Sequence, residues 1–213
     1  ILALSHDEVV HGKKSLMHKM WGDRYRQKAQ LRLLMALTML HPGKKLSFMG
    51  NEWGQFLEWK YNEGLEWSDL EDDLNQKTLL FAKTLNELYQ KENAFYLHDH
   101  EGLGLEIIDA DNAEESVLTF MRKGKTKKET IIGIFNFTPV ERQHFKIGVP
   151  YEGEYEEILN SEMKEYGGTF TQGNPLLSTK KKAFKNYDNT IELLVPAFGA
   201  VYLKPKKISR KTK

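Results

Sequence analysis

Residues 25–40 read YRQKAQLRLLMALTML and run directly into His41-Pro42-Gly43, where proline and glycine stop a helix. No breaker interrupts the stretch, so the sequence predicts a helix from Tyr25 to Leu40. The last two turns carry almost no polar side chain, which predicts burial on all sides of the helix. The apolar run Leu46–Met49 follows and predicts a short buried strand that leads into a loop at Gly50-Asn51-Glu52.

The segments on either side extend this pattern. Leu2-Ala3-Leu4 predicts the end of a strand, and one apolar face predicts a second helix over residues 73–91. Strand, helix, strand, helix is a βαβα unit, which requires a parallel sheet. Two strands make no viable parallel sheet, because such sheets are buried on both faces. We therefore expect further strands upstream of Ile1 and a chain that is the C-terminal fragment of a longer protein.

After Glu101 the hydrophobic pattern changes. It no longer has the repeat of a helix and instead repeats every two residues, as in a β-strand. Short runs rich in β-branched and aromatic residues alternate with turn residues, a pattern that favours an antiparallel β-sandwich. We place the domain boundary at residues 100/101 and expect residues 204–213 to form a solvated basic tail. The predicted strands are Leu103–Ile108, Ser116–Arg122, Thr130–Phe137, His144–Val149, Tyr155–Leu159, Thr190–Val195 and Ala200–Lys204.

Composition excludes several classes of protein. A formal net charge of +1 over 213 residues gives no global bias toward nucleic acid or an anionic membrane. The chain has no cysteine, which excludes disulfides and thiolate metal sites. No apolar run is long enough to span a membrane and no signal peptide opens the chain, so we expect a cytoplasmic protein.

The segment Ser5–Lys13 (SHDEVVHGK) concentrates the chemistry of the chain. His6 and His11 are five residues apart, whereas two zinc ligands on one helix face need a spacing of four, so we expect no metal. Ser5-His6-Asp7 cannot act as a catalytic triad, because sequence neighbours cannot reach one another in that geometry. In a loop beyond a barrel strand, His6 and Asp7 would hydrogen-bond the hydroxyls of a sugar. Alternatively, His6-Asp7-Glu8 only satisfies its own loop and caps the next helix.

This segment resembles the fourth signature region of the α-amylase superfamily, in the form carried by 1,4-α-glucan branching enzymes. The His6-Asp7 pair is general to the superfamily, whereas the run from Glu8 to Ser15 is much closer to branching enzymes than to amylases. Further similarity covers nearly the whole chain, at Pro42–Leu46, Phe48–Glu52, Glu58-Trp59, Asn136–Val140 and Glu157–Asn160.

The resemblance implies an α/β plus all-β chain: the C-terminal part of a catalytic (β/α)8 barrel over residues 1–100, then an all-β C-terminal domain over residues 101–213. It implies an enzyme that cuts an α-1,4-glucan and reattaches the segment through an α-1,6 linkage by a retaining mechanism, without cofactor or metal. The partners implied are the glucan and the missing N-terminal barrel half. We expect the isolated chain to be inactive and to expose an apolar patch that promotes association.

The resemblance also assigns roles to individual residues. His6 and Asp7 bind hydroxyls of the distorted sugar, while the nucleophilic Asp and the acid Glu belong to earlier barrel strands. We expect Glu52 and Trp53 to support substrate binding. Packing is the favoured interpretation for the aromatic rings of Trp53, Trp59 and Trp67, with stacking on glucose as the alternative. Trp53 and Gly54 stand where the resemblance leads us to expect Phe and Ala.

Two other functions stay open at this point. One is a different α-amylase-superfamily enzyme, such as a debranching or trehalose-forming hydrolase, against which the run from Glu8 to Ser15 counts. The other is a noncatalytic glucan-binding or protein-interaction module built on the β-rich half.

Overall fold

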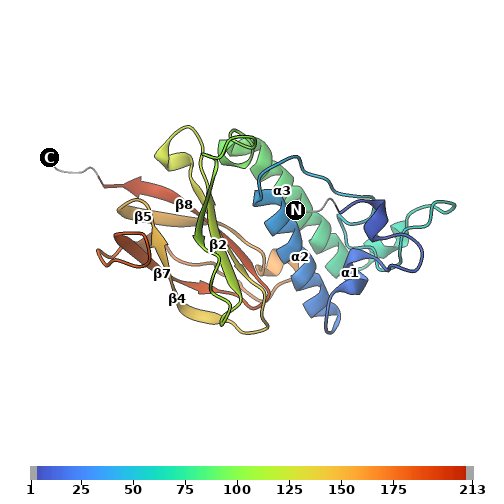
Figure 1. Cartoon of the computed structure of the whole chain (residues 1–213). Coiled ribbons are helices and arrows are strands. Elements are labelled where there is room, and N and C mark those ends of the chain that lie inside the picture. Colours follow the sequence, from blue (N-terminus) through green and yellow to red (C-terminus); the bar gives the residue numbers. More distant parts are fainter. Residues whose placement is uncertain (1–3, 210–213) are drawn as a thin grey trace.

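The structure is a computed structural model that describes residues 4–209. Helices occupy the first half of the chain and strands the second, and the two parts pack side by side (Figure 1). The α-helices are α1 (Leu16–Lys19), α2 (Arg24–Leu40) and α3 (Asp73–Lys91). The strands are β1 (Leu105–Asp109), β2 (Val117–Arg122), β3 (Ile131–Asn136), β4 (Arg142–Val149), β5 (Gly153–Asn160), β6 (Leu177–Ser178), β7 (Asn189–Val195) and β8 (Ala200–Ile208).

Capping residues define both long helices. The Asp23 side chain accepts a hydrogen bond from the backbone of Arg26 at the start of α2, and α2 ends before His41-Pro42-Gly43 as predicted. The Asp72 side chain accepts two backbone hydrogen bonds, from Leu74 and Asn75, at the start of α3. Both predicted helices are confirmed, and the short helix α1 was not predicted.

The predicted strand at Leu46–Met49 is wrong. Residues 41–66 form turns and irregular loop, and Leu46 and Met49 are exposed. An apolar run pairs as a strand only where a neighbouring strand supplies hydrogen-bond partners, and no strand of the described residues lies alongside it. Residues 2 and 3 of the other expected strand lie outside the described part of the chain. The structure therefore does not show the parallel sheet of a barrel.

The predicted antiparallel sandwich is confirmed. One sheet has six strands in the order β1-β2-β3-β8-β5-β6, and the second pairs β4 with β7; every pairing of these strands is antiparallel. All seven predicted strands are present within a few residues of the expected bounds, and the two-residue β6 was missed. The first strand begins at Leu105, while the division into domains at residues 100/101 stays a prediction.

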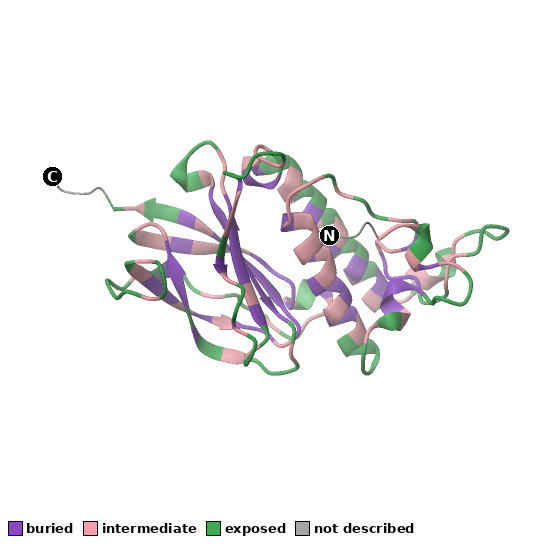
Figure 2. Cartoon of the chain, in the orientation of Figure 1, coloured by how far each residue is buried: buried purple, intermediate pink, exposed green. Residues whose placement is uncertain are grey.

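The central strands of the large sheet are buried on both faces, as Figure 2 shows. On β3, Ile132 and Ile134 face the second sheet, whereas Ile131 and Phe135 face α2 and α3. The expected burial of α2 on all sides is wrong, because the sheet covers only one side of its last turns. Leu33, Ala36 and Leu40 are buried, but Leu34, Leu37 and Met39 remain half-buried.

The expected basic tail also needs correction. Residues 204–208 continue β8 along β5, where Lys206 pairs with Glu156 at 2.6 Å and Lys204 pairs with Glu92 at 2.5 Å. Neighbouring carboxylates thus neutralise lysines that the sequence alone leaves unpaired. Residues 210–213 lie outside the described part. No helix within residues 4–209 is long and apolar enough to cross a membrane.

A fully buried ion pair joins α2 to the end of β5. Arg32 Nη2 lies 2.5 Å from Glu162 Oε1, and Arg32 Nε donates to the Ser161 carbonyl at 2.8 Å. The Tyr25 hydroxyl donates to the second oxygen of Glu162 at 2.6 Å. Both charges lie out of reach of water, so each depends on the other for compensation.

We expect Glu162→Ala to lower the free energy of unfolding by about 3–5 kcal/mol, because it leaves the buried Arg32 guanidinium without its carboxylate. Urea unfolding measures the change. The control is Glu156→Ala, which removes the partly exposed pair with Lys206 and is expected to cost less than about 1 kcal/mol. Equal losses in the two variants would contradict the prediction.

Candidate functional site

The His6-Asp7 pair lies on a single turn of 3-10 helix, His6–Glu8, capped by Ser5. His6 Nε2 lies 3.3 Å from Asp7 Oδ1, and the two side chains are 54% and 73% exposed. The next helix, α1, is capped by the Ser15 hydroxyl and not by His6, Asp7 or Glu8. The pair is thus open to solvent, and the alternative expectation that His6-Asp7-Glu8 caps the next helix is wrong.

Aromatic residues of the 48–59 loop support this turn from one side. The His6 ring lies 6.1 Å from the ring of Phe48 and 6.2 Å from that of Trp59, and these two rings meet edge to face at 5.2 Å. The Trp59 backbone also donates to the Val9 carbonyl at 2.8 Å, beside the buried Val9 side chain. Trp59 is thus half-buried, with its ring packed against Phe48 and His6.

Glu52 and Trp53 lie in the turn region at residues 49–54. Glu52 lines a cavity of about 500 Å³ between α2, α3 and the 41–52 loop, and Leu4, two residues before His6, lines the same cavity. Glu52 Oε2 is buried with no hydrogen-bond partner among the described residues.

Trp53 lies inside the protein. Only 4% of its surface is exposed, and its ring packs 5.0 Å from that of Trp67, which is 62% exposed. Between these two indoles, Trp67 is the one that presents a face to solvent. The structure places Trp53 beneath the surface and does not bring it into contact with the His6-Asp7 pair.

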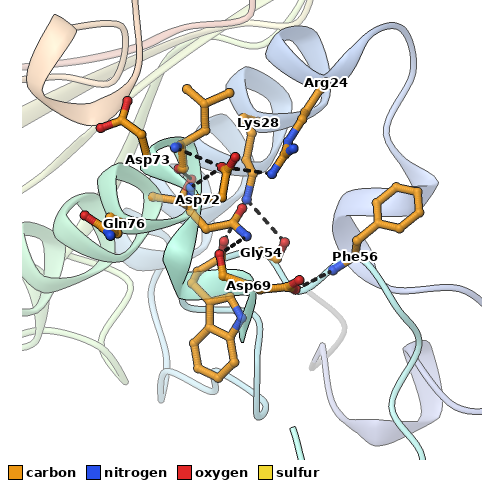
Figure 3. Close-up of polar contacts among 12 residues, drawn as sticks. Arg24, Lys28, Gly54, Phe56, Asp69, Asp72, Asp73 and Gln76 are labelled. Carbon is orange, nitrogen blue, oxygen red and sulfur yellow. Dashed lines mark hydrogen bonds and ion pairs between the residues drawn. The ribbon is translucent and has the colours of Figure 1, made fainter. Parts of the chain in front are cut away.

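Lys28 of α2 binds the backbone of this turn region through its buried side chain. The Lys28 ammonium group donates to the carbonyls of Trp53 at 2.7 Å and Gly54 at 3.2 Å (Figure 3). Asp69 and Asp72 flank the lysine, and Asp72 also pairs with Arg24 at 2.8 Å. Burial lowers the pKa of Lys28 to about 7, an effect that the Arg24 charge increases and the two aspartates oppose.

Two side chains of α2, Lys28 and Leu31, account for the glycine found where alanine was expected. Gly54 has a φ of +68°, and a Cβ there would lie 2.7 Å from Lys28 Nζ and 2.6 Å from Leu31 Cδ2. A side chain at position 54 therefore collides with the group that binds its own carbonyl. The departure at Gly54 was the one sign in the sequence that pointed to Lys28.

The remaining sequence-based expectations concern metals and histidines. Within residues 4–209 no three His, Asp or Glu side chains gather in a way that could hold a metal ion. His11 lies 3.3 Å from Glu58 rather than beside His6, so the two histidines of the segment act separately.

Comparison with known proteins first identifies the domain family of the β-rich half. Residues 107–206 match the family model for the alpha amylase C-terminal all-beta domain. An alpha-amylase from H. orenii superposes with a TM-score of 0.58 at 16% identity, covering 95% of this chain and 38% of that one. The Nostoc punctiforme debranching enzyme gives 0.61 at 14% identity, covering 92% and 34%. At such identities the likeness concerns the fold alone.

Sequence relatives then define the particular group. The 1,4-alpha-glucan branching enzyme GlgB of Lactobacillus acidophilus is 52% identical over all of this chain and 34% of its own length. That of Lactiplantibacillus plantarum is 45% identical over 98% of this chain and 33% of its own. The chain is a homologue of the 1,4-α-glucan branching enzymes of the α-amylase superfamily, as the sequence predicted. It spans about a third of the length of these curated relatives.

We expect Gly54→Ala to destabilise the protein by about 1–3 kcal/mol, through the left-handed backbone and the collision with Lys28. The double variant Gly54→Ala/Lys28→Ala removes the collision with Lys28 and leaves that with Leu31. Its loss of unfolding free energy should therefore be smaller than the sum of the losses in the two single variants. Thermal unfolding of the three variants provides the comparison. Strict additivity would show that Lys28 does not set the requirement for glycine.

Lys28 also predicts a dependence of stability on pH. Between pH 7 and 10.5 the unfolded chain carries a proton on this lysine that the folded chain has lost, so stability rises with pH by up to about 1.4 kcal/mol per unit. The difference in unfolding free energy between the wild type and Lys28→Met, followed over this range, isolates the lysine from other titrating groups. A difference that stays constant with pH would refute the lowered pKa.

Proposed function

We propose that this chain supplies the His6-Asp7 part of the glucan site in a branching enzyme. The enzyme cuts an α-1,4-glucan and rejoins the released segment through an α-1,6 linkage by retaining double displacement. The observation that carries the proposal is the exposed pair at His6 and Asp7, held 3.3 Å apart on a capped turn. The names of the curated relatives, 42–52% identical to the chain, support the glucan as substrate.

The chemistry of Asp7 suits the transition state of this reaction. Glycosyl transfer passes through an oxocarbenium-like state in which positive charge develops on the sugar ring. A carboxylate near that ring binds the transition state more tightly than the neutral ground state, and such differential binding accelerates the reaction. The neighbouring His6 imidazole can donate a hydrogen bond to a sugar hydroxyl.

The proposal assigns the rest of the chemistry to polypeptide other than these 213 residues. The nucleophilic Asp and the acid Glu would come from earlier strands of a (β/α)8 barrel, of which residues 1–100 would form the last part. The 213-residue chain alone would then be inactive. The half-buried side of α2 and the 500 Å³ cavity beside Glu52 are surfaces that the earlier strands would cover. A cytoplasmic location forms part of the same proposal.

The test uses a chimera in which this chain replaces the matching third of the Lactobacillus acidophilus branching enzyme. We expect Asp7→Asn to lower kcat by roughly 10²–10³-fold with little change in KM, because the lost charge acts in the transition state. Glu8→Gln alters a half-buried carboxylate one residue away that pairs with Lys19. It serves as the matched control and should retain activity.

Product analysis separates transfer from hydrolysis. Branching lowers the iodine staining of amylose without releasing reducing ends, whereas a hydrolase releases one reducing end for each bond cut. A chimera that only releases reducing ends would overturn the proposed branching activity. A rise in KM at unchanged kcat for Asp7→Asn would overturn the role of Asp7 in the transition state.

A further inference from the structure

The Glu58 carboxylate binds the turn that follows the His6-Asp7 pair. Glu58 Oε2 accepts hydrogen bonds from the backbone of Gly12 at 2.9 Å and of Lys14 at 3.1 Å. Gly12 and Lys14 have φ values of +80° and +66°. Left-handed residues in such a turn direct their N–H groups toward one point and create a concavity for an anion. Here a side chain 44–46 residues away in the sequence supplies that anion.

The charge of Glu58 strengthens this arrangement. The two backbone N–H groups are the largest influences on the carboxyl and lower its pKa, so the group is ionised at neutral pH. His11 Nδ1 lies 3.3 Å from Glu58 Oε1, and the charges of His11 and Lys60 lower the pKa of the Glu58 carboxyl further. A left-handed conformation at the non-glycine Lys14 is sterically unfavourable by itself. The hydrogen bond to Glu58 therefore holds the backbone in a state it would otherwise leave.

Lys13 connects this turn to Asp7. It lies between the two residues that Glu58 binds, and its ammonium group donates to the Asp7 carbonyl at 2.7 Å. Its backbone N–H donates to the Val10 carbonyl at 2.9 Å, which closes the turn. The position of the Lys13 side chain thus follows from the backbone conformation that Glu58 fixes on either side of it.

The residue beside Glu58 acts on the same segment. Trp59 binds the Val9 carbonyl through its backbone and packs its ring near His6. Residues 58 and 59 together contact the 6–14 segment at Gly12, Lys14, Val9 and His6. Three of these contacts are hydrogen bonds, to Gly12, Lys14 and Val9, and the fourth is the ring contact with His6.

We propose that Glu58 is a positioning residue of the glucan site, which orders the 11–14 turn and, through Lys13, fixes the backbone of Asp7. Its consequence for catalysis rests on the proposed function, whereas its effect on the turn is a property of the chain itself. Glu58 acts through Gly12, Lys13 and Lys14 and not by contact with the sugar.

Amide hydrogen exchange on the 213-residue chain tests the effect on the turn. We expect Glu58→Ala to accelerate exchange at Gly12 and Lys14 by about tenfold, because both amides lose a charged acceptor. Glu58→Gln keeps an oxygen acceptor of the same shape and should give an intermediate effect. Glu63→Ala is the matched control, since the Glu63 carboxylate pairs with Lys60 at the surface and with no other cation of residues 4–209.

Exchange in the β3 strand reports whether each variant is folded. If Glu58→Ala fails to fold, the isosteric Glu58→Gln carries the test. Unchanged exchange at Gly12 and Lys14 in a folded Glu58 variant would overturn the proposal.

Kinetics of the chimera test the connection to Asp7. We expect Glu58→Gln and Lys13→Gln each to lower kcat by about tenfold with KM within about twofold, and the double variant to be no worse than either alone. Independent, multiplicative losses would overturn the path through Lys13. If Asp7→Asn leaves turnover unchanged, the proposed function fails, and the exchange rates of Gly12 and Lys14 still decide whether Glu58 holds the turn.

Discussion

The close contact between α2 and the six-stranded sheet is the constraint on which the other parts depend. Leu40 Cδ2 lies 2.4 Å from where a Cβ of Gly133 would be, so only glycine permits the approach at that point of β3. Arg122 donates to the Leu40 carbonyl at 2.9 Å and the Tyr202 hydroxyl to the Ala36 carbonyl. Arg122 thus satisfies the Leu40 carbonyl, which has no partner within the helix, whereas Tyr202 adds a second hydrogen bond to the Ala36 carbonyl.

The same helix also contacts the loops that form the candidate site. Toward its N-terminal end, Lys28 binds the turn at residues 53–54, and Leu31 packs with Val9 and Met17. The 48–59 loop continues from there to Glu58 and Trp59, which hold the 6–14 segment. Packed and hydrogen-bonded neighbours thus connect α2 to the 6–14 segment.

Elements with a local cause were predictable from the sequence, and elements that depend on distant contacts were not. The bounds of α3 follow from one apolar face and the Asp72 cap. The strands follow from a hydrophobic pattern that repeats every two residues. Leu46–Met49 has the composition of a strand but no strand beside it. In the site, the turn at His6-Asp7 was predictable, whereas Lys28 and Glu58 act on residues 25–26 and 44–46 positions away. Such contacts leave no local pattern, apart from the glycine at position 54.

Three carboxylates near the site differ in what their oxygens already bind, and this difference separates their roles. Glu58 is occupied by two backbone N–H groups and His11, so it has little capacity left for a substrate. The Asp7 carboxylate pairs only with His6 among the residues that the structure describes and is open to solvent. Glu52 has one buried oxygen without a partner in the same part of the chain. A carboxylate stabilises a developing positive charge on a sugar best when its oxygens can approach the sugar and are not occupied by other hydrogen bonds. By that criterion Asp7 is suited to contact the sugar and Glu58 to support it from behind.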